Sequence, residues 1–505
     1  MKSIGIVNIG ITGSRISGYI RDMSIASSFG ANFITDAFFV AFTIPNMLRQ
    51  LLGEGALSVA FIPIFTRYFG KDKKEAWRLG SIVVNLLFVI SSLIAILGII
   101  FSPIIIKIIA PGFKGEEAYP LAVKLTRIMF PFVILISLSA LIMGILNSCR
   151  HFFLPAIAPI LLNLGMIASI YLLCPAFTQP IIGLAIGVLI GGFGYLIIQI
   201  PGLIKHKMRY QLTFDLSHPG LREISHLFIP AILGLAASQM ILIFIGRILA
   251  SYLVVGSVSF LYFANRLIQL PTSLFGVAIA TVSFPSISEY AAINQPHKVK
   301  DTFLYSLKMV IFTTIPVTIG LIILGKPIIQ VLFQRGEFSE ASVQDTYSCL
   351  FYYSFGLIGY SSLKVIIRTF YALKDAITPL KVGLLIILVN VILSLILMRP
   401  LEASGLALAT SISSLLNVSI LLIILEKRIG HMVSKEMLIF FLRVLFAAGI
   451  MGLICLFLIT KLQITLILRV SITIIAGIIS LFFISRFLHI EEANLILKVL
   501  KPGYK

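Results

Sequence analysis

Charged residues are scarce in this sequence, and acids are scarcest. Only 12% of its 505 residues are charged, and Asp and Glu together number 20. Soluble domains carry about 25% charged residues, so this composition leaves no room for a sizeable soluble domain. The acids stand mostly in loops and form no cluster with a catalytic His, as a membrane glycosyltransferase or phosphatase would need. We therefore predict that the chain is not an enzyme.

Cysteine is almost as rare. The four cysteines are scattered without a C-x-x-C pair, and the seven histidines show no metal-binding spacing. They are Cys149, Cys174, Cys349 and Cys455. This pattern is typical of buried apolar residues and not of a disulfide framework, so we expect neither a structural metal nor a cofactor.

Long apolar runs are what the sequence has instead, since 59% of its residues are hydrophobic. Runs of about 20 such residues are typical of transmembrane helices. We predict an all-α polytopic membrane protein of about 14 such helices. Their expected spans are 4–28, 33–69, 76–109, 118–148, 152–174, 179–204, 223–251, 256–293, 298–334, 341–372, 377–398, 403–428, 434–460 and 464–487. Pro45, Pro63, Pro131 and Pro316 are candidate kinks.

The basic residues that give the net charge of +20 lie mainly in short loops. The loops 27–32, 174–180 and 254–257 contain no Lys or Arg, whereas KDKK, KHKMR, HKVK and EKR occupy loops of the alternate set. By the positive-inside rule both termini are cytoplasmic. The first run reads as a retained helix and not as a signal peptide, because no cleavage site follows it. The charge therefore indicates anionic lipid headgroups as partners and not nucleic acid.

An internal repeat divides the chain. FIPIFTRY (61–68) resembles SFPSISEY (283–290), and GLAIG (183–187) resembles GLALA (405–409), at a separation of 222 residues. SPIIIKIIAPGF and RHFFLP have counterparts at a separation of 224 residues. Each repeat holds six predicted helices, so the two copies enter the membrane from the same side. We predict an N-lobe (1–210), a C-lobe (211–430), and a C-terminal helix pair with a cytoplasmic tail (431–505).

Four arginines interrupt the apolar runs. They are Arg15, Arg21, Arg49 and Arg266. A charge at the bilayer centre costs about 2.5–3.5 kcal/mol even on the lenient insertion scale, so these side chains are expected to line a wet cavity. Guanidinium groups suit phosphate and pyrophosphate oxygens, and an excess of buried cations indicates an anionic substrate. The alternative is that the arginines pair with Asp22, Asp36 and Glu54 and only fix the helices. Arg247 is a weaker cavity candidate, and Arg368, Arg443 and Arg469 are expected to reach the interface.

Several segments together resemble a known family. They are SRISGYIRD (14–22), TDAFFVAFTIPNMLRQLLGEGALSVAFIPIF (35–65), LPAIAPILLN (154–163), ANRLIQLP (264–271), LFQRGEF (332–338), FYALKDAITP (370–379) and GLALATSISSLLN (405–417). In this order they are similar to the MurJ (MviN) family of lipid II flippases, within the MOP exporter superfamily. The resemblance covers nearly the whole chain, including the C-terminal helix pair.

The resemblance implies two six-helix bundles in a V plus two helices whose groove holds a lipid tail. It implies transport of lipid II, undecaprenyl-pyrophosphoryl-MurNAc-pentapeptide-GlcNAc, to the outer leaflet of the bacterial inner membrane for peptidoglycan synthesis. Arg15, Arg21, Arg49 and Arg266 match the family's cavity arginines, and Asp36 matches its acid on the second helix. Cell-wall synthesis and division proteins are possible partners.

Two departures from the family concern energy coupling. Asn265 and Gln269 stand where acids often flank the arginine of the eighth helix. Gly246 and Arg247 stand near one of the sodium-binding acids of some relatives. Asn390, Ser394 and Thr410 offer only neutral oxygens and are weak sodium candidates. We therefore expect coupling to membrane potential or protons. The open alternatives are another cargo, such as a drug or an O-antigen-type oligosaccharide, and a scaffold role without transport.

Overall fold

The computed structural model of the chain describes residues 2–51, 57–113, 117–432 and 435–493, and the elements in these ranges are helical. By its internal contacts the chain divides into two compact units. The first comprises Met1–Ser259 and Arg335–Phe338, and the second comprises Phe260–Gln334 and Ser339–Lys505.

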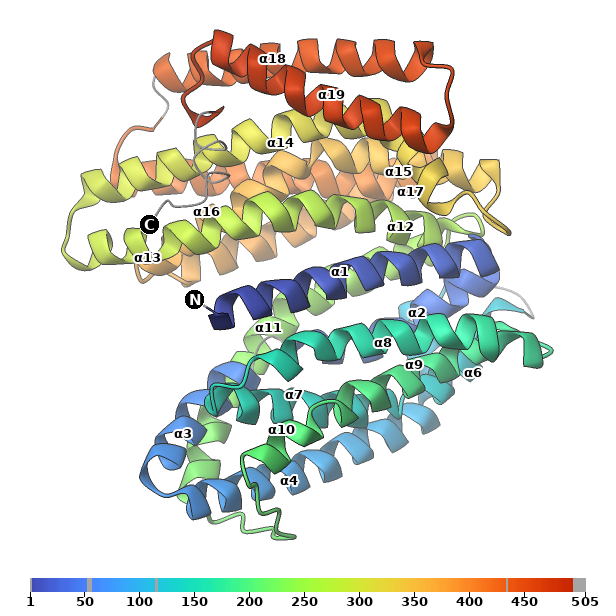
Figure 1. Ribbon diagram of the computed structural model, residues 1–505, viewed down its shortest axis with the longest axis vertical. Helices are drawn as coiled ribbons and strands as arrows, with labels where there is room; N and C mark the ends of the chain where they lie inside the picture. The colour runs from blue at the N-terminus through green and yellow to red at the C-terminus, as the bar shows by residue number, and fades with distance from the viewer. Residues whose placement is uncertain (1, 52–56, 114–116, 433–434, 494–505) are drawn as a thin grey trace. The chain divides into compact units, whose positions relative to one another are not determined.

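The first unit contains eleven α-helices in the described ranges. They are α1 (Lys2–Phe29), α2 (Phe33–Leu51), α3 (Leu57–Lys71), α4 (Lys73–Ile100), α5 (Ser102–Ile109), α6 (Ala118–Met129), α7 (Phe132–Ser148), α8 (Phe153–Leu172), α9 (Ile181–Ile197), α10 (Ile200–Lys205) and α11 (Pro219–Ser251). Helix α8 packs against both α1 and α9, as Figure 1 shows. A hydrophobic core lies among α3, α4, α7 and α11, around Phe61, Phe65 and Trp77.

Glycines allow α8 and α9 to touch along their backbones. A Cβ atom placed on Gly165 would lie 2.4 Å from the Cα atom of Gly191, and one on Gly191 would lie 2.5 Å from the carbonyl oxygen of Leu162. Small residues of this kind are how membrane helices approach closely when no hydrophobic force drives them together. The contact fixes α8, which carries part of the candidate site, against the rest of the unit.

The second unit is built from α12 (Ser257–Pro271), whose first turn belongs to the first unit, and the helices after it. They are η3 (Thr272–Val277, a π-helix), α13 (Ala278–Ala292), α14 (Pro296–Phe333), α15 (Glu340–Phe355), α16 (Leu357–Ala372), α17 (Ile377–Ile429), α18 (Lys435–Lys461) and α19 (Leu466–Phe487). Its core includes Phe303, Phe370 and Leu421, and α18 and α19 pack on one another and on α14.

Two breaks interrupt the long apolar segments. Pro131 lies between α6 and α7, which bend by 40°. The segment 377–429 is interrupted at Glu402, whose φ of 50° and ψ of −130° are not helical. A Cβ atom on Gly405 would lie 2.2 Å from the carbonyl oxygen of Leu397, so the chain reverses tightly there. This break falls between the predicted spans 377–398 and 403–428.

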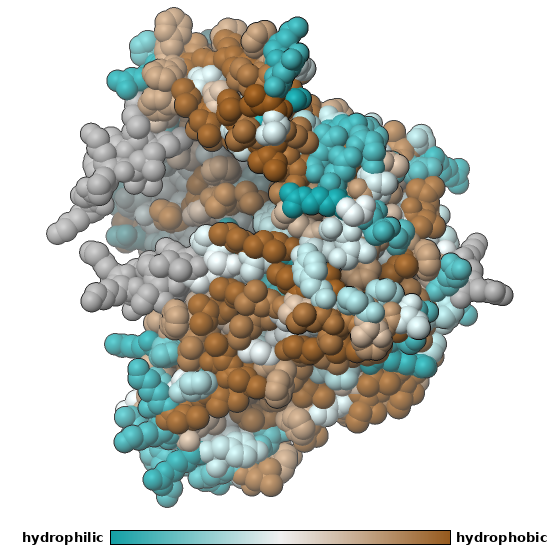
Figure 2. Space-filling model, turned by 45° about the vertical axis from the view of Figure 1, so that its right-hand side comes forward, coloured by the Kyte–Doolittle hydropathy of each residue, from teal (hydrophilic) through white to brown (hydrophobic). Residues whose placement is uncertain are grey.

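The described helices fit a membrane. Eight are long and apolar enough to cross one, or up to ten if each bent pair is one span. Helix α4 leaves large apolar side chains exposed, including Phe88, Leu93 and Ile100, and α18 and α19 do the same. On the face drawn in Figure 2 hydrophobic side chains cover broad areas, and hydrophilic ones gather in patches. Such extended apolar surface needs lipid around it, which confirms the prediction of an all-α polytopic membrane protein.

Candidate functional site

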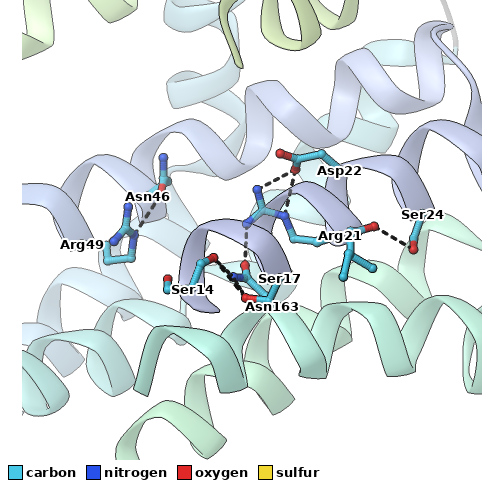
Figure 3. A network of polar contacts seen from close by, with 9 residues as sticks. Ser14, Ser17, Arg21, Asp22, Ser24, Asn46, Arg49 and Asn163 are labelled. Carbon is cyan, nitrogen blue, oxygen red and sulfur yellow. Dashed lines mark hydrogen bonds and ion pairs between the residues drawn. The ribbon is translucent and has the colours of Figure 1, made fainter. Parts of the chain in front are cut away.

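Arg21 is held in the interior of the first unit by a carboxylate and an amide. Its Nε and Nη2 atoms donate to Oδ1 of Asp22 at 3.0 and 2.6 Å, and Nη1 donates to Oδ1 of Asn163 at 3.1 Å (Figure 3). The side chain of Arg21 is 11% exposed and that of Asp22 is fully buried. Because each group offsets the charge of the other, the pair lowers the cost of burying either one.

Asn163 joins α8 to α1 through the same network. Its Nδ2 atom donates to the carbonyl oxygen of Ser14 at 3.1 Å and to Oγ of Ser17 at 2.9 Å (Figure 3). The amide therefore binds α1 at three points, one of them the guanidinium of Arg21. Asn163 is not among the site residues predicted from the sequence. The feature of the sequence that could have indicated it is a lone amide within the apolar run LPAIAPILLN.

Arg15 and Arg49 line one cavity of about 270 Å³ in the first unit. Helices α1, α2, α7, α8 and α9 supply its walls, with Ser14 and Tyr195 as further polar groups. Arg15 is exposed, and Nε of Arg49 donates to Oδ1 of Asn46 at 3.1 Å (Figure 3). One water occupies about 30 Å³ in the liquid, so the cavity has room for a hydrated anion. Two cations and no acid in its lining favour such a ligand.

Arg266 belongs to the second unit, on α12. It is half-buried, whereas its neighbours Asn265 and Gln269 are exposed. The π-helix η3 follows α12 directly after Pro271. π-Helical turns often occur at functional sites, because they re-aim side chains within an otherwise regular helix.

In the contacts that the structure describes, the carboxylate of Asp36 binds the N-terminus of α12 and not an arginine side chain. Its Oδ2 atom accepts from the backbone N–H of Gly256 at 2.7 Å. Its Oδ1 atom accepts from the backbone N–H and the hydroxyl of Ser259 at 2.8 and 2.6 Å. A carboxylate at a helix N-terminus satisfies N–H groups that have no partner within the helix. Nearby, Nη1 of Arg247 donates to the carbonyl oxygen of Val258 at 3.3 Å. Glu54 lies outside the described residues.

The weak sodium candidates all lie on α17. Nδ2 of Asn390 donates to Oγ of Ser413 at 3.2 Å, and the hydroxyl of Thr410 donates to the carbonyl oxygen of Leu406 at 2.8 Å. Ser394 is buried. Among the described residues, no group of three or more His, Cys, Asp or Glu side chains could hold a metal ion.

The remaining arginines have local partners or lie at the surface. Nη1 of Arg368 donates to the hydroxyl of Thr281 at 2.7 Å, and Nη2 of Arg469 donates to the carbonyl oxygen of Ile464 at 3.0 Å. Arg443 is exposed on α18.

The architecture is that of solved transporters of the MOP superfamily. It is similar to a solved inward-facing structure of a multidrug resistance MATE family transporter of that superfamily, with a TM-score of 0.66 at 17% sequence identity. That match covers 85% of this chain and 98% of the other. A likeness at this level of identity establishes the architecture alone.

The family follows from closer matches. The family model described as "Lipid II flippase MurJ" matches residues 25–477. Lipid II flippase MurJ of Burkholderia cenocepacia is 33% identical over 445 residues, which are 87% of this chain and 86% of that protein. A solved structure, lipid II flippase MurJ in an inward closed conformation, matches with a TM-score of 0.81 at 30% identity, over 95% of this chain and 98% of the other. The chain belongs to the MurJ lipid II flippase family.

Family membership confirms several predictions made from the sequence. The protein is a multi-pass membrane transporter with lipid II as its substrate, and its activity is flipping and not a chemical reaction.

Proposed function

We propose that the protein carries lipid II from the inner to the outer leaflet of the cytoplasmic membrane by alternating access, with its arginines holding the pyrophosphate. The cavity shared by Arg15 and Arg49 supports this proposal most directly. Its two guanidinium groups offer charge-assisted hydrogen bonds to phosphate oxygens. A cavity with this lining disfavours a cationic drug as cargo.

Arg21 and Arg266 have different parts in this scheme. Arg21 keeps its orientation through Asp22 and Asn163, so its guanidinium is held in place without reorganisation. Arg266 is the cation that the second unit contributes. When the substrate neutralises these charges, the two lobes can approach and the opposite side can open. Asp22, Asp36 and Glu54 are supporting acids that exchange partners during the cycle.

The domain roles follow the internal repeat. Residues 1–210 and 211–430 act as the two moving lobes, and residues 431–505 provide the groove for the polyprenyl tail. Exposed apolar side chains on α18 and α19, such as Leu453, Phe457 and Phe487, support this role because they suit contact with a hydrocarbon chain. The distribution of Lys and Arg among the loops supports cytoplasmic termini.

Energy coupling is assigned to membrane potential or protons. Moving one elementary charge through the potential is worth about 2.3 kcal/mol per 100 mV, so cationic lobes respond to it strongly. On α17 the candidates Asn390, Ser394 and Thr410 offer only neutral oxygens and no acid, which disfavours a sodium site there. Membrane phospholipids and proteins of cell-wall synthesis and division are the proposed partners.

The test is complementation in bacteria depleted of their own lipid II flippase, with outward-accessible lipid II as the readout. Wild type should restore accessibility, and Arg49→Ala and Arg266→Ala should lose most of it at matched membrane levels. Arg209→Ala serves as control, because this exposed arginine lies in the segment between α10 and α11. Full rescue by both cavity variants would remove the arginines from the mechanism and favour a scaffold role.

A further inference from the structure

A second cavity, of about 470 Å³, lies between α3 and α11, both in the first unit. Its rim carries Arg67 from α3 and Arg222, Glu223 and His226 from α11. Its apolar lining consists of Pro63, Ile64 and Leu227. We refer to these seven residues as the α3–α11 groove. None of them lines the cavity of Arg15 and Arg49.

The charged and the apolar residues of the groove occupy different positions along the two helices. Helix α3 ends at Lys71, beside the basic loop, and α11 begins at Pro219. On α3, Arg67 is nearer that end, and Pro63 and Ile64 lie one turn further in. On α11, Arg222 is nearer the start, and Leu227 lies more than one turn further in. Both helices therefore carry their charged residues near the loop end and apolar residues further from it along the helix. The apolar surface continues along α11 into the exposed Ile229.

The cations of the rim are only partly neutralised. Nη2 of Arg67 donates to Oε1 and Oε2 of Glu223 at 2.7 and 2.6 Å, and the two side chains are 49% and 44% exposed. Arg222 is exposed, and in the part of the chain that the structure describes its guanidinium donates to no other group. His226, one turn along α11 from Arg222, is also exposed. The rim therefore has a net positive charge and unused donors.

A ligand for this groove needs one anionic group and an attached apolar part. We propose that the α3–α11 groove binds an anionic phospholipid, with its phosphate between Arg67 and Arg222 and its upper chain along Pro63, Ile64 and Leu227. Guanidinium groups bind phosphate oxygens in a fork geometry. Basic pockets between transmembrane helices are where anionic headgroups bind. On the proposed orientation the lipid comes from the cytoplasmic leaflet. The site is separate from the flipping activity and is tested separately from it.

The experiment is native mass spectrometry of the delipidated full chain in detergent, titrated with phosphatidylglycerol or with phosphatidylcholine of the same chains. We expect one phosphatidylglycerol to bind about tenfold more tightly than phosphatidylcholine, which corresponds to 1.4 kcal/mol. Arg222→Gln should abolish this preference. Lys381→Gln, which removes an exposed cation from α17, should leave it unchanged.

A second variant keeps the proposal falsifiable if Arg222→Gln folds poorly. Glu223→Gln removes the competing acid from Arg67, so it should strengthen phosphatidylglycerol binding severalfold. Equal binding of the two lipids, or equal effects of Arg222→Gln and Lys381→Gln, would overturn the proposal. Displacement of phosphatidylglycerol by inorganic phosphate, or by a lipid-linked pyrophosphate in an Arg222-dependent way, would assign the groove to that other phosphate source and also overturn it.

Discussion

The guanidinium of Arg78 donates to Oδ2 of Asp215 at 3.0 Å and ties α4 to the segment 206–218, which leads into α11. Ser81 and Asn85 lie on the same face of α4. The hydroxyl oxygen of Ser81 accepts from the N–H of Gln211 at 3.1 Å, and Asn85 donates to the carbonyl oxygens of two residues of the segment. One helical face thus fixes the non-helical connection along its length.

Acid should loosen this connection. The Ser217 hydroxyl and backbone N–H, with Arg78 beside them, hold the pKa of Asp215 below its ordinary value. The folded state therefore favours the carboxylate. The resulting stabilisation is complete above the ordinary pKa of about 3.9 and is lost as pH falls through the lower folded pKa.

In the wild type the thermal unfolding midpoint should fall as the pH drops below about 4. In Asp215→Asn this fall should be less steep. The measurement is unfolding of the purified protein in detergent across an acid series. Asp301→Asn removes an exposed aspartate from α14 and is the charge-matched control. Identical acid profiles for wild type and Asp215→Asn would contradict the prediction.

Asn85 should be the strongest single support of the connection. It donates to the carbonyl oxygens of Gln211 and Thr213 at 3.1 and 2.9 Å and accepts from the Tyr210 hydroxyl at 2.6 Å. Its side chain is buried, so Asn85→Ala leaves these groups short of partners and should cost about 1–3 kcal/mol.

Limited proteolysis within 206–218, together with the unfolding midpoint, measures this effect. Tyr210→Phe removes only one of the three hydrogen bonds and provides a graded control, with an expected cost of about 0.5–1.5 kcal/mol. If Tyr210→Phe cost as much as Asn85→Ala, the network would not be centred on the amide.

Variants of the Arg21–Asp22 pair can separate the effect of charge on stability from the effect of packing. Arg21→Met leaves a fully buried carboxylate without its main counter-ion and should destabilise the protein by about 3–5 kcal/mol. The double variant Arg21→Met/Asp22→Leu removes both charges and should regain most of that stability, while lipid II transport stays impaired. Thermal unfolding and the complementation assay give the two readouts. A double variant no more stable than the single one would show that the ion pair is not the reason for the loss.

The sequence predicted the membrane helices, the bend at Pro131 and the reversal between 398 and 403, because apolar runs and prolines are local signals. It also indicated the intramembrane arginines as site residues, because placing each of these charges in a membrane costs free energy that only a functional role would justify. It did not show that Asn163 connects Arg21 to α8, or that Asn85 fixes the segment 210–215. Those contacts join residues more than 120 positions apart, and periodicity carries no information about which helices become neighbours.

The close approach of Gly165 and Gly191 has a mechanical consequence. At Gly165 and Gly191 backbone atoms stand in the space that side chains would otherwise fill, so this part of the joint between α8 and α9 has no rotatable groups that can slide or repack. Lipid cannot enter it, and it cannot act as a shear plane. Helices α8 and α9 therefore move together as one rigid body. The flexibility that a transport cycle needs must come from other parts of the chain.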